Sequence, residues 1–208
     1  EMTNAITHHA TDETLARYAA GSLDEARRLV VAMHVSRCPA CADQIGRFEA
    51  VGGAFLEGAP AAPLRPGALE AALRRIDQGG LYPEDLPGAD PLSGYALGPW
   101  RWVGPGVRQR SVSVPEVDGI KVFMLKAAPG TKLPHHKHTG YEWTCVLEGA
   151  FEHQFGRYGA GDFDEADETM EHKPTVCEGV PCICIVALKG GIELQSRLGR
   201  LLQPLIRL

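Results

Sequence analysis

The stretch that decides the fold is GTKLPHHKHTGYEWTCVLEG, which runs from Gly130 to Gly149. Between these two glycines, which are typical of turns, it carries the metal-type side chains of His136, His138 and Glu142. Residues two apart on a strand point to the same face, so His136 and His138 face together, and Glu142 joins them if the strand continues without a bulge. We therefore predict strands that aim several metal ligands at one point.

A further histidine, His172, follows the turn sequence GAGD at residues 159–162 and can complete a site of three histidines and one glutamate across the sheet. Such a ligand set suits zinc, iron, manganese, nickel or copper, so the residue types alone do not select the ion. We predict a second divalent metal here and take zinc as the expected ion. The alternative is a polar strand face with histidines exposed to solvent.

The sequence around this stretch has the composition of strands. Three runs, at residues 119–126, 141–148 and 181–189, are rich in strand-forming residues and are bounded by turn residues. From about residue 100 onward the apolar residues recur with a period of two, which is typical of an antiparallel β-sandwich or barrel. We predict that residues 101–208 form an all-β domain.

Residues 10 to 78 instead have apolar residues at helical spacing, and we predict helices at 12–20, 22–34, from 39 onward and around 69–76. Ser22 and Glu25 have the spacing of a capping box, and Pro39 suits a first helical turn. Pro/Gly-rich sequence separates this region from the strands. The predicted fold class is therefore α + β in two domains: a helical bundle at 1–80, a linker at 81–100 and the all-β domain.

A second group of metal-type residues lies in the helical region. His34, Cys38 and Cys41 form the pattern H-x3-C-x2-C, in which the first two lie one helical turn apart and the following turn brings the third back toward them. Zinc prefers four ligands in a tetrahedron, and His9 is the nearest remaining candidate, with His8 as the alternative. Zinc would contribute on the order of 10 kcal/mol to a domain whose own core is small.

The same cysteines allow two other interpretations. The sequence CPAC is a C-x-x-C pattern that could cycle between dithiol and disulfide at a helix start, or the two thiols could be inert. A thioredoxin-like site needs a preceding strand, whereas the sequence before Cys38 has helical spacing. We therefore favour structural zinc.

Composition limits the classes of partner. The formal net charge is −5 and the basic residues form no stripe, so we expect no direct binding to nucleic acid. No run approaches the roughly 18 apolar residues of a membrane span, and the N-terminal residues lack the apolar segment of a signal peptide. We expect a cytoplasmic protein without a membrane anchor, whose six cysteines are reduced.

Both groups of ligands resemble known family motifs. The first cupin motif, G-x5-H-x-H-x3-E-x6-G, is matched by Gly130, His136, His138, Glu142 and Gly149. The second cupin motif is matched only in part, by Gly161 and His172. The usual proline and glycine before that histidine are absent, and Val176 stands where an asparagine is common.

The H-x3-C-x2-C pattern, with His9 before it, resembles the zinc-binding anti-sigma domain. A zinc-binding anti-sigma domain followed by a cupin is the arrangement of the ChrR-type anti-sigma factors, which this sequence resembles over nearly its whole length. The shared stretches include YAAG at 18–21, AVGG at 50–53 and LEGAF at 147–151. The resemblance implies a partner, a sigma factor of the extracytoplasmic-function type, and a response to singlet oxygen or related oxidants.

This resemblance leads to a mechanistic hypothesis. Zinc would rigidify the helices so that their apolar faces, including part of the run LVVAM at 29–33, cover the polymerase-binding surface of the sigma factor, with the cupin as sensor. The run could equally be buried inside its own bundle. The main rival is a cupin metalloenzyme, dioxygenase-like, with an accessory helical domain; a third is a regulator in which oxidation of Cys38 and Cys41 expels zinc.

Overall fold

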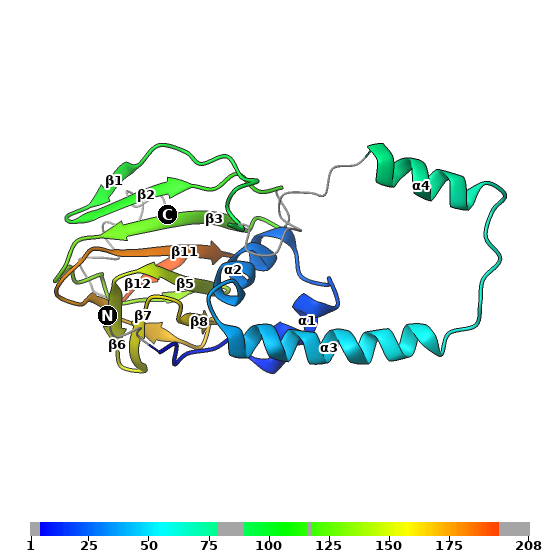
Figure 1. Cartoon of the computed structure of the whole chain (residues 1–208). Helices are drawn as coiled ribbons and strands as arrows, with labels where there is room; N and C mark the ends of the chain where they lie inside the picture. The colour runs from blue at the N-terminus through cyan, green and yellow to red at the C-terminus, as the bar shows by residue number, and fades with distance from the viewer. Residues whose placement is uncertain (1–4, 79–89, 116–117, 196–208) are drawn as a thin grey trace.

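The computed structural model describes residues 5–78, 90–115 and 118–195 (Figure 1). Four helices come first and a β-rich part follows, as the sequence predicted. The first part of the predicted linker, residues 81–89 with Tyr82 and Leu86, lies outside the described residues. Its second part includes Leu92 and Tyr95, which pack against the core.

The helices begin and end where local side chains permit. They are α1 (Asp12–Ala19), α2 (Glu25–Val35), α3 (Pro39–Glu57) and α4 (Ala68–Gln78). α1 is followed by Gly21, whose φ of +63° suits a glycine. The predicted capping box at Ser22 is wrong: its hydroxyl donates to the carbonyl of Arg17 and closes α1, while the Asp24 carboxylate accepts from the amide of Arg27 and begins α2.

The strands form one large sheet and two small ones. The large sheet has the order β1-β2-β3-β11-β5-β8, and the small ones have the orders β10-β6-β7 and β12-β4-β9, with antiparallel pairing throughout. The bounds are β1 (Arg101–Gly104), β2 (Val107–Ser111), β3 (Lys121–Ala127), β4 (His136–His138), β5 (Glu142–Glu148), β6 (Ala150–His153), β7 (Gly156–Gly159), β8 (Phe163–Ala166), β9 (Glu171–His172), β10 (Thr175–Val176), β11 (Cys182–Leu188) and β12 (Ile192–Leu194).

The large sheet is covered on both faces, and β11 shows this most clearly. Its sequence CICIVAL is apolar throughout, as expected of a strand without a solvent face. Alternate residues enter two different cores. Those facing the small sheets are Cys182, Cys184, Val186 and Leu188, and those facing the helices are Ile183, Ile185 and Ala187.

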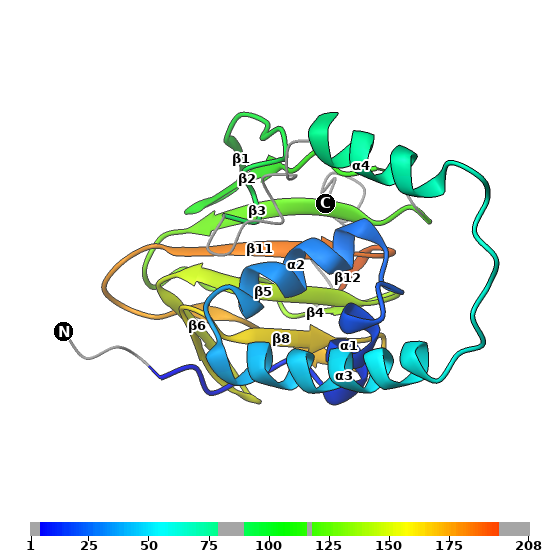
Figure 2. The same cartoon turned by 45° about the vertical axis from the view of Figure 1, so that its right-hand side comes forward.

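Helix α2 covers the second face of the large sheet, where it lies across β5 and β11 (Figure 2). Its apolar run is buried except for Ala32, which is partly exposed: Leu29, Val30, Val31 and Met33 are each at most 1% exposed. The hypothesis that part of this run faces a partner is therefore wrong. The run is longer than one stripe because α2 is packed between the sheet on one side and α1 and α3 on the other.

The far end of α3 and all of α4 extend from this core. Ile45, near the start of α3, is buried, whereas the side chain of Phe55 is 77% exposed, because the helix continues beyond the sheet (Figure 1). Helix α4 stands apart from the other helices in Figure 1, and its apolar residues are exposed. Among the helices of the described ranges, none combines the length and apolarity needed to cross a membrane.

The predicted continuous strand through His136, His138 and Glu142 is also wrong. The chain turns at residues 139–141, so the two histidines lie on β4 and the glutamate begins β5, in a different sheet. Gly140 permits this turn because a Cβ there would lie 2.5 Å from the carbonyl oxygen of Lys189. The histidines of β4 and the glutamate of β5 therefore lie in two different sheets and not along one strand.

The shared core leads to a stability prediction. Leu29→Ala leaves a cavity between α2 and the sheet and should lower the free energy of unfolding by about 2–5 kcal/mol, measured by urea denaturation. Leu73→Ala, on the exposed face of α4, is the matched control and should change it by less than about 0.5 kcal/mol. Equal effects of the two substitutions would contradict the described packing of α2.

Candidate metal centres

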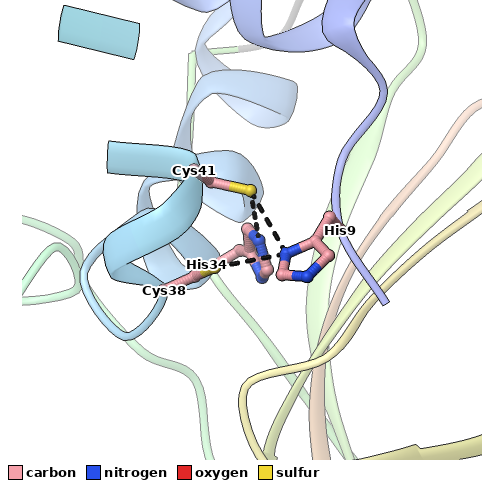
Figure 3. A group of neighbouring side chains, drawn as sticks. All are labelled: His9, His34, Cys38 and Cys41. Atoms are coloured by element: carbon pink, nitrogen blue, oxygen red, sulfur yellow. Dashed lines mark hydrogen bonds between the residues drawn. The ribbon is translucent and has the colours of Figure 1, made fainter. Parts of the chain in front are cut away.

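The four residues predicted as a zinc site in the helical part lie together (Figure 3). One ligand atom from each of His9, His34, Cys38 and Cys41 falls within 4.8 Å of all the others. His34 Nε2 lies 3.2 Å from Cys41 Sγ, and His9 Nδ1 lies 3.3 Å from Cys38 Sγ and 3.5 Å from Cys41 Sγ. Two nitrogens and two sulfurs converge as tetrahedral coordination requires.

Three short elements place these side chains. His9 precedes α1 in an extended segment, His34 lies in the last turn of α2, and both cysteines lie at the start of α3. Cys38 is the N-cap residue of α3, its side chain makes no capping hydrogen bond, and Pro39 begins the helix. His8, the alternative ligand, is not in this group and lies near Asp162.

The protonation of the group suits a cation. Burial lowers the pKa of His34, which keeps its imidazole neutral and able to coordinate. Burial, together with the neighbouring Cys38 thiol, raises the pKa of Cys41. A buried thiolate at this position therefore needs a positive charge beside it, which a metal ion supplies.

A second group lies inside the β-rich part. The ring of His172 is hydrogen-bonded through Nε2 to two other imidazoles, at 3.0 Å from His136 Nε2 and 3.2 Å from His138 Nε2. His136 on β4 is directly opposite His172 on β9, and all three side chains are buried. Three Nε2 atoms that face one another form one side of a coordination sphere.

These histidines are held in the form that binds metal. Burial and the neighbouring His136 lower the pKa of His138 to about 4 and that of His172 to about 3, and burial also lowers the pKa of His136. All three rings are therefore neutral near pH 7. The chemistry of the donor set fits a divalent metal and does not select one ion.

Glu142, the predicted fourth ligand, lies in the same cavity but outside the group of Nε2 atoms. Its Oε2 is 3.9 Å from His138 Nδ1, the ring nitrogen that does not face the other histidines. Burial, followed by the nearby Asp164, raises the pKa of Glu142 to about 8. Without a cation beside it, this carboxyl is mostly protonated at pH 7.

Sequence reasoning missed two polar residues of this cavity. His153 and Asp164 form a further group with His172, and His153 Nε2 lies 3.5 Å from Asp164 Oδ2. Asp164 alternates with Phe163 along β8, so an aspartate at an inward-facing strand position was the available signal. His153 ends β6 and could be placed only by the packing of the small sheet.

An apolar cavity of about 60 Å³ adjoins His172. It is lined in part by Cys182 and Cys184, whose sulfurs are 3.6 Å apart. The carboxyl groups of Glu142 and Asp164 also line it. The hydrogen bond with Cys182, followed by burial, raises the pKa of Cys184, so the Cys184 thiol is protonated at neutral pH.

Comparison with known proteins shows the family of this chain. Residues 95–190 match the model of the ChrR cupin-like domain. The anti-sigma-E factor ChrR of Cereibacter sphaeroides is 36% identical over 214 residues, covering 98% of this chain and 99% of that protein. The chain belongs to the ChrR family of anti-sigma factors.

A solved structure of this family has the same fold. The crystal structure of Rhodobacter sphaeroides SigE in complex with the anti-sigma ChrR matches with a TM-score of 0.77 and 37% identity, covering 89% of this chain and 100% of that chain. The similarity therefore extends beyond the cupin-like domain into the helical part. The match to the cupin-like domain contains all three buried histidines of the second group.

The two groups should bind metal independently. Cys38→Ser with Cys41→Ser removes one equivalent of divalent metal per chain and leaves the other, and His136→Ala with His138→Ala does the reverse. Metal analysis by plasma mass spectrometry of full-length protein, purified reduced and without a His tag, measures this. Cys177→Ser, which removes a thiol outside both groups, should retain both equivalents. An unchanged stoichiometry in either double variant contradicts that assignment.

Proposed function

We propose that this protein is an anti-sigma factor that binds and inhibits a sigma factor of the extracytoplasmic-function type, and releases it under oxidative stress such as singlet oxygen. The observation that carries the proposal is the similarity over nearly the full length to ChrR, whose solved structure is a complex with SigE. Since its partner acts on RNA polymerase, the protein works in the cytoplasm. Membership of this family favours a regulator over the dioxygenase-like cupin enzyme.

The exposed apolar surface of α3 and α4 supports the proposal. Residues spaced four and three apart lie on one face of α4, and further apolar residues line the last turns of α3. Such a surface is costly in water unless a partner covers it. The residues are Val51, Phe55 and Leu56 on α3, and Leu69, Leu73 and Ile76 on α4, all more than half exposed.

The arrangement of the two helices suits a folded helical partner. The chain between α3 and α4 makes a wide turn, so the two apolar helices are held apart (Figure 1). A helix of the sigma factor could lay its apolar face against them, as in other helix-in-groove complexes. We propose that this contact covers the polymerase-binding surface of the sigma factor.

We propose zinc as the ion held by His9, His34, Cys38 and Cys41. Their ligand atoms all lie within 4.8 Å of one another and three of the four residues are buried, and two imidazoles with two thiolates are a usual ligand set of structural zinc. Zinc would join the segment before α1 to the junction of α2 and α3. It would thus fix the start of α3, the helix whose far end carries the proposed partner surface.

We propose that the cupin-like domain is the sensor and holds a second divalent metal, with zinc as the expected ion. His136, His138 and His172 would supply the imidazoles, and Glu142 in the same cavity the carboxylate. A bound cation would favour the charged form of this carboxyl. The neighbouring thiols of Cys182 and Cys184 place oxidisable groups beside the metal ligands.

Partner binding can be tested on the exposed helices. Phe55→Asp and Leu73→Asp each place a charge on the proposed contact and should weaken binding of the sigma factor encoded beside this gene by at least about tenfold, measured by titration calorimetry. Val180→Asp changes a similarly exposed apolar residue of the β-rich part and should leave the affinity unchanged. Wild-type affinity in both helix variants, or no binding by the wild type, would refute the proposal.

Release can be tested on the preformed complex. Illumination with a singlet-oxygen sensitiser should free the sigma factor and restore transcription by RNA polymerase in vitro. A variant with His136→Ala and His138→Ala should bind the sigma factor normally but release it much more slowly. Equal release by this variant and the wild type would show that the second metal group is not the sensor.

A further inference from the structure

The turn between β7 and β8 forms hydrogen bonds with the segment that precedes His9. Asp162 Oδ1 accepts hydrogen bonds from the backbone amides of Thr7, at 2.7 Å, and His8, at 2.9 Å. In the opposite direction, the amide of Phe163 donates to the carbonyl of His8 at 3.1 Å. The backbone immediately before a predicted metal ligand is therefore held by a residue more than 150 positions later in the chain.

The carboxylate of Asp162 also stabilises its own turn. Its Oδ2 accepts from the amide of Gly159 at 2.7 Å. Burial raises the pKa of Asp162, but hydrogen bonds from the amides of His8, Gly159 and Thr7 outweigh burial and leave this pKa below its usual value. The group is thus a charged acceptor with three backbone donors, which makes these bonds stronger than neutral ones.

The same turn fixes the ring of His34. The carbonyl oxygen of Gly161 lies 2.7 Å from His34 Nδ1, and the His34 side chain is fully buried. A carbonyl only accepts, so Nδ1 must carry the proton, which leaves the lone pair on Nε2. Nε2 is the nitrogen that lies 3.2 Å from Cys41 Sγ.

Close packing explains the glycine at this position. Gly161 has a φ of +94°, which other residues rarely adopt. A Cβ there would lie 2.6 Å from Cδ1 of Ile6, in the same N-terminal segment. The side chain of Ile6 therefore packs directly against the Cα of Gly161.

We propose that the β7–β8 turn is the outer shell of the metal site in the helical part, with Asp162 positioning His9 through the backbone and the Gly161 carbonyl orienting the ring of His34. This inference rests on the proposed metal site and adds how that site is controlled. Outer contacts of this kind fix the orientation of metal-bound imidazoles and affect metal affinity by about 10–100-fold.

According to this proposal, the metal site in the helical part depends on contacts with the cupin-like domain. Cys38 and Cys41 are placed by the junction of α2 and α3, whereas both histidines also depend on a turn of the cupin-like domain. Any change in that domain that shifts the turn weakens the metal site. By linkage, metal binding in turn strengthens the contact between the turn and the helices.

The test compares zinc release from the full-length zinc-loaded protein. Asp162→Ala removes both bonds to the N-terminal segment and should speed zinc release to a chelating dye by about tenfold or more. Asp162→Asn keeps an amide oxygen for Thr7 and His8 and should restore most of the slow release. Asp167→Ala is the matched control, because Asp167 also accepts from a turn amide, that of Thr169, but is not within hydrogen-bond distance of the helical part.

Each outcome decides one question. All variants carry His136→Ala and His138→Ala, so that release reports on the first site, and thermal unfolding checks that each is folded. Rapid release from the Asp162→Ala variant with rescue by asparagine supports the inference. If a folded Asp162→Ala variant releases zinc at the rate of the parent protein, the inference about Asp162 is overturned. The proposed function is not affected by that result, because the parent protein still holds zinc at the first site. A parent protein that binds no zinc would instead overturn the proposed site itself.

The bond to His34 has an independent readout. Coordination through Nε2 with donation to Gly161 should give a His34 Nδ1 proton that exchanges slowly with water in the nuclear magnetic resonance spectrum of the zinc-loaded protein. An Nδ1 proton in rapid exchange, or coordination through Nδ1, would overturn the role given to Gly161.

Discussion

The burial of both faces of the six-stranded sheet is the constraint on which the rest of this structure depends. Alternate residues of β11 enter two cores, one against the small sheets and one against the helices. A sheet with one face in water would leave Ile185 and Ala187 exposed. Helix α2 therefore belongs to the core of the β-rich part as much as to the helical one.

This shared core determines where the metal ligands lie. The first group forms where the end of α2, the start of α3 and the N-terminal segment meet the edge of the large sheet at β8. The second group lies on the other side of the same sheet, among strands of the small sheets. One sheet thus separates a site whose ligands hold helices together from a site enclosed by strands.

The sequence predicted those parts of the sites that local geometry determines. His34, Cys38 and Cys41 are brought together by one helix end and one turn, and His136 and His138 by the period of a strand. A continuous strand from His138 to Glu142 does not form, because the chain turns after His138 at Gly140, where the backbone of Lys189 approaches. His153 and Asp164 were missed because they meet only when β6 and β8 pack across the cavity.

The wrong prediction for α2 has a similar cause. Its apolar run was interpreted either as a possible partner surface or as buried within the helical bundle, whereas strands β5 and β11, which cover it, lie more than 100 residues later. Patterns within a helix reveal that a face is apolar but not what it packs against. The large apolar residues of α4 and of the last turns of α3 also recur at helical spacing, but they are exposed to solvent, whereas those of the α2 run are buried.

Helix α3 connects these environments physically. Its first turn carries Cys38 as N-cap and Cys41, while its last turns carry Phe55 and Leu56 in solvent. At 1.5 Å per residue, its 19 residues span roughly 28 Å. A continuous helix transmits a tilt at one end as a displacement at the other, and the displacement grows with distance from the pivot. The ligands that fix the start of α3 therefore also determine where its apolar end is presented, and a long helix needs no change in its own structure to couple the two.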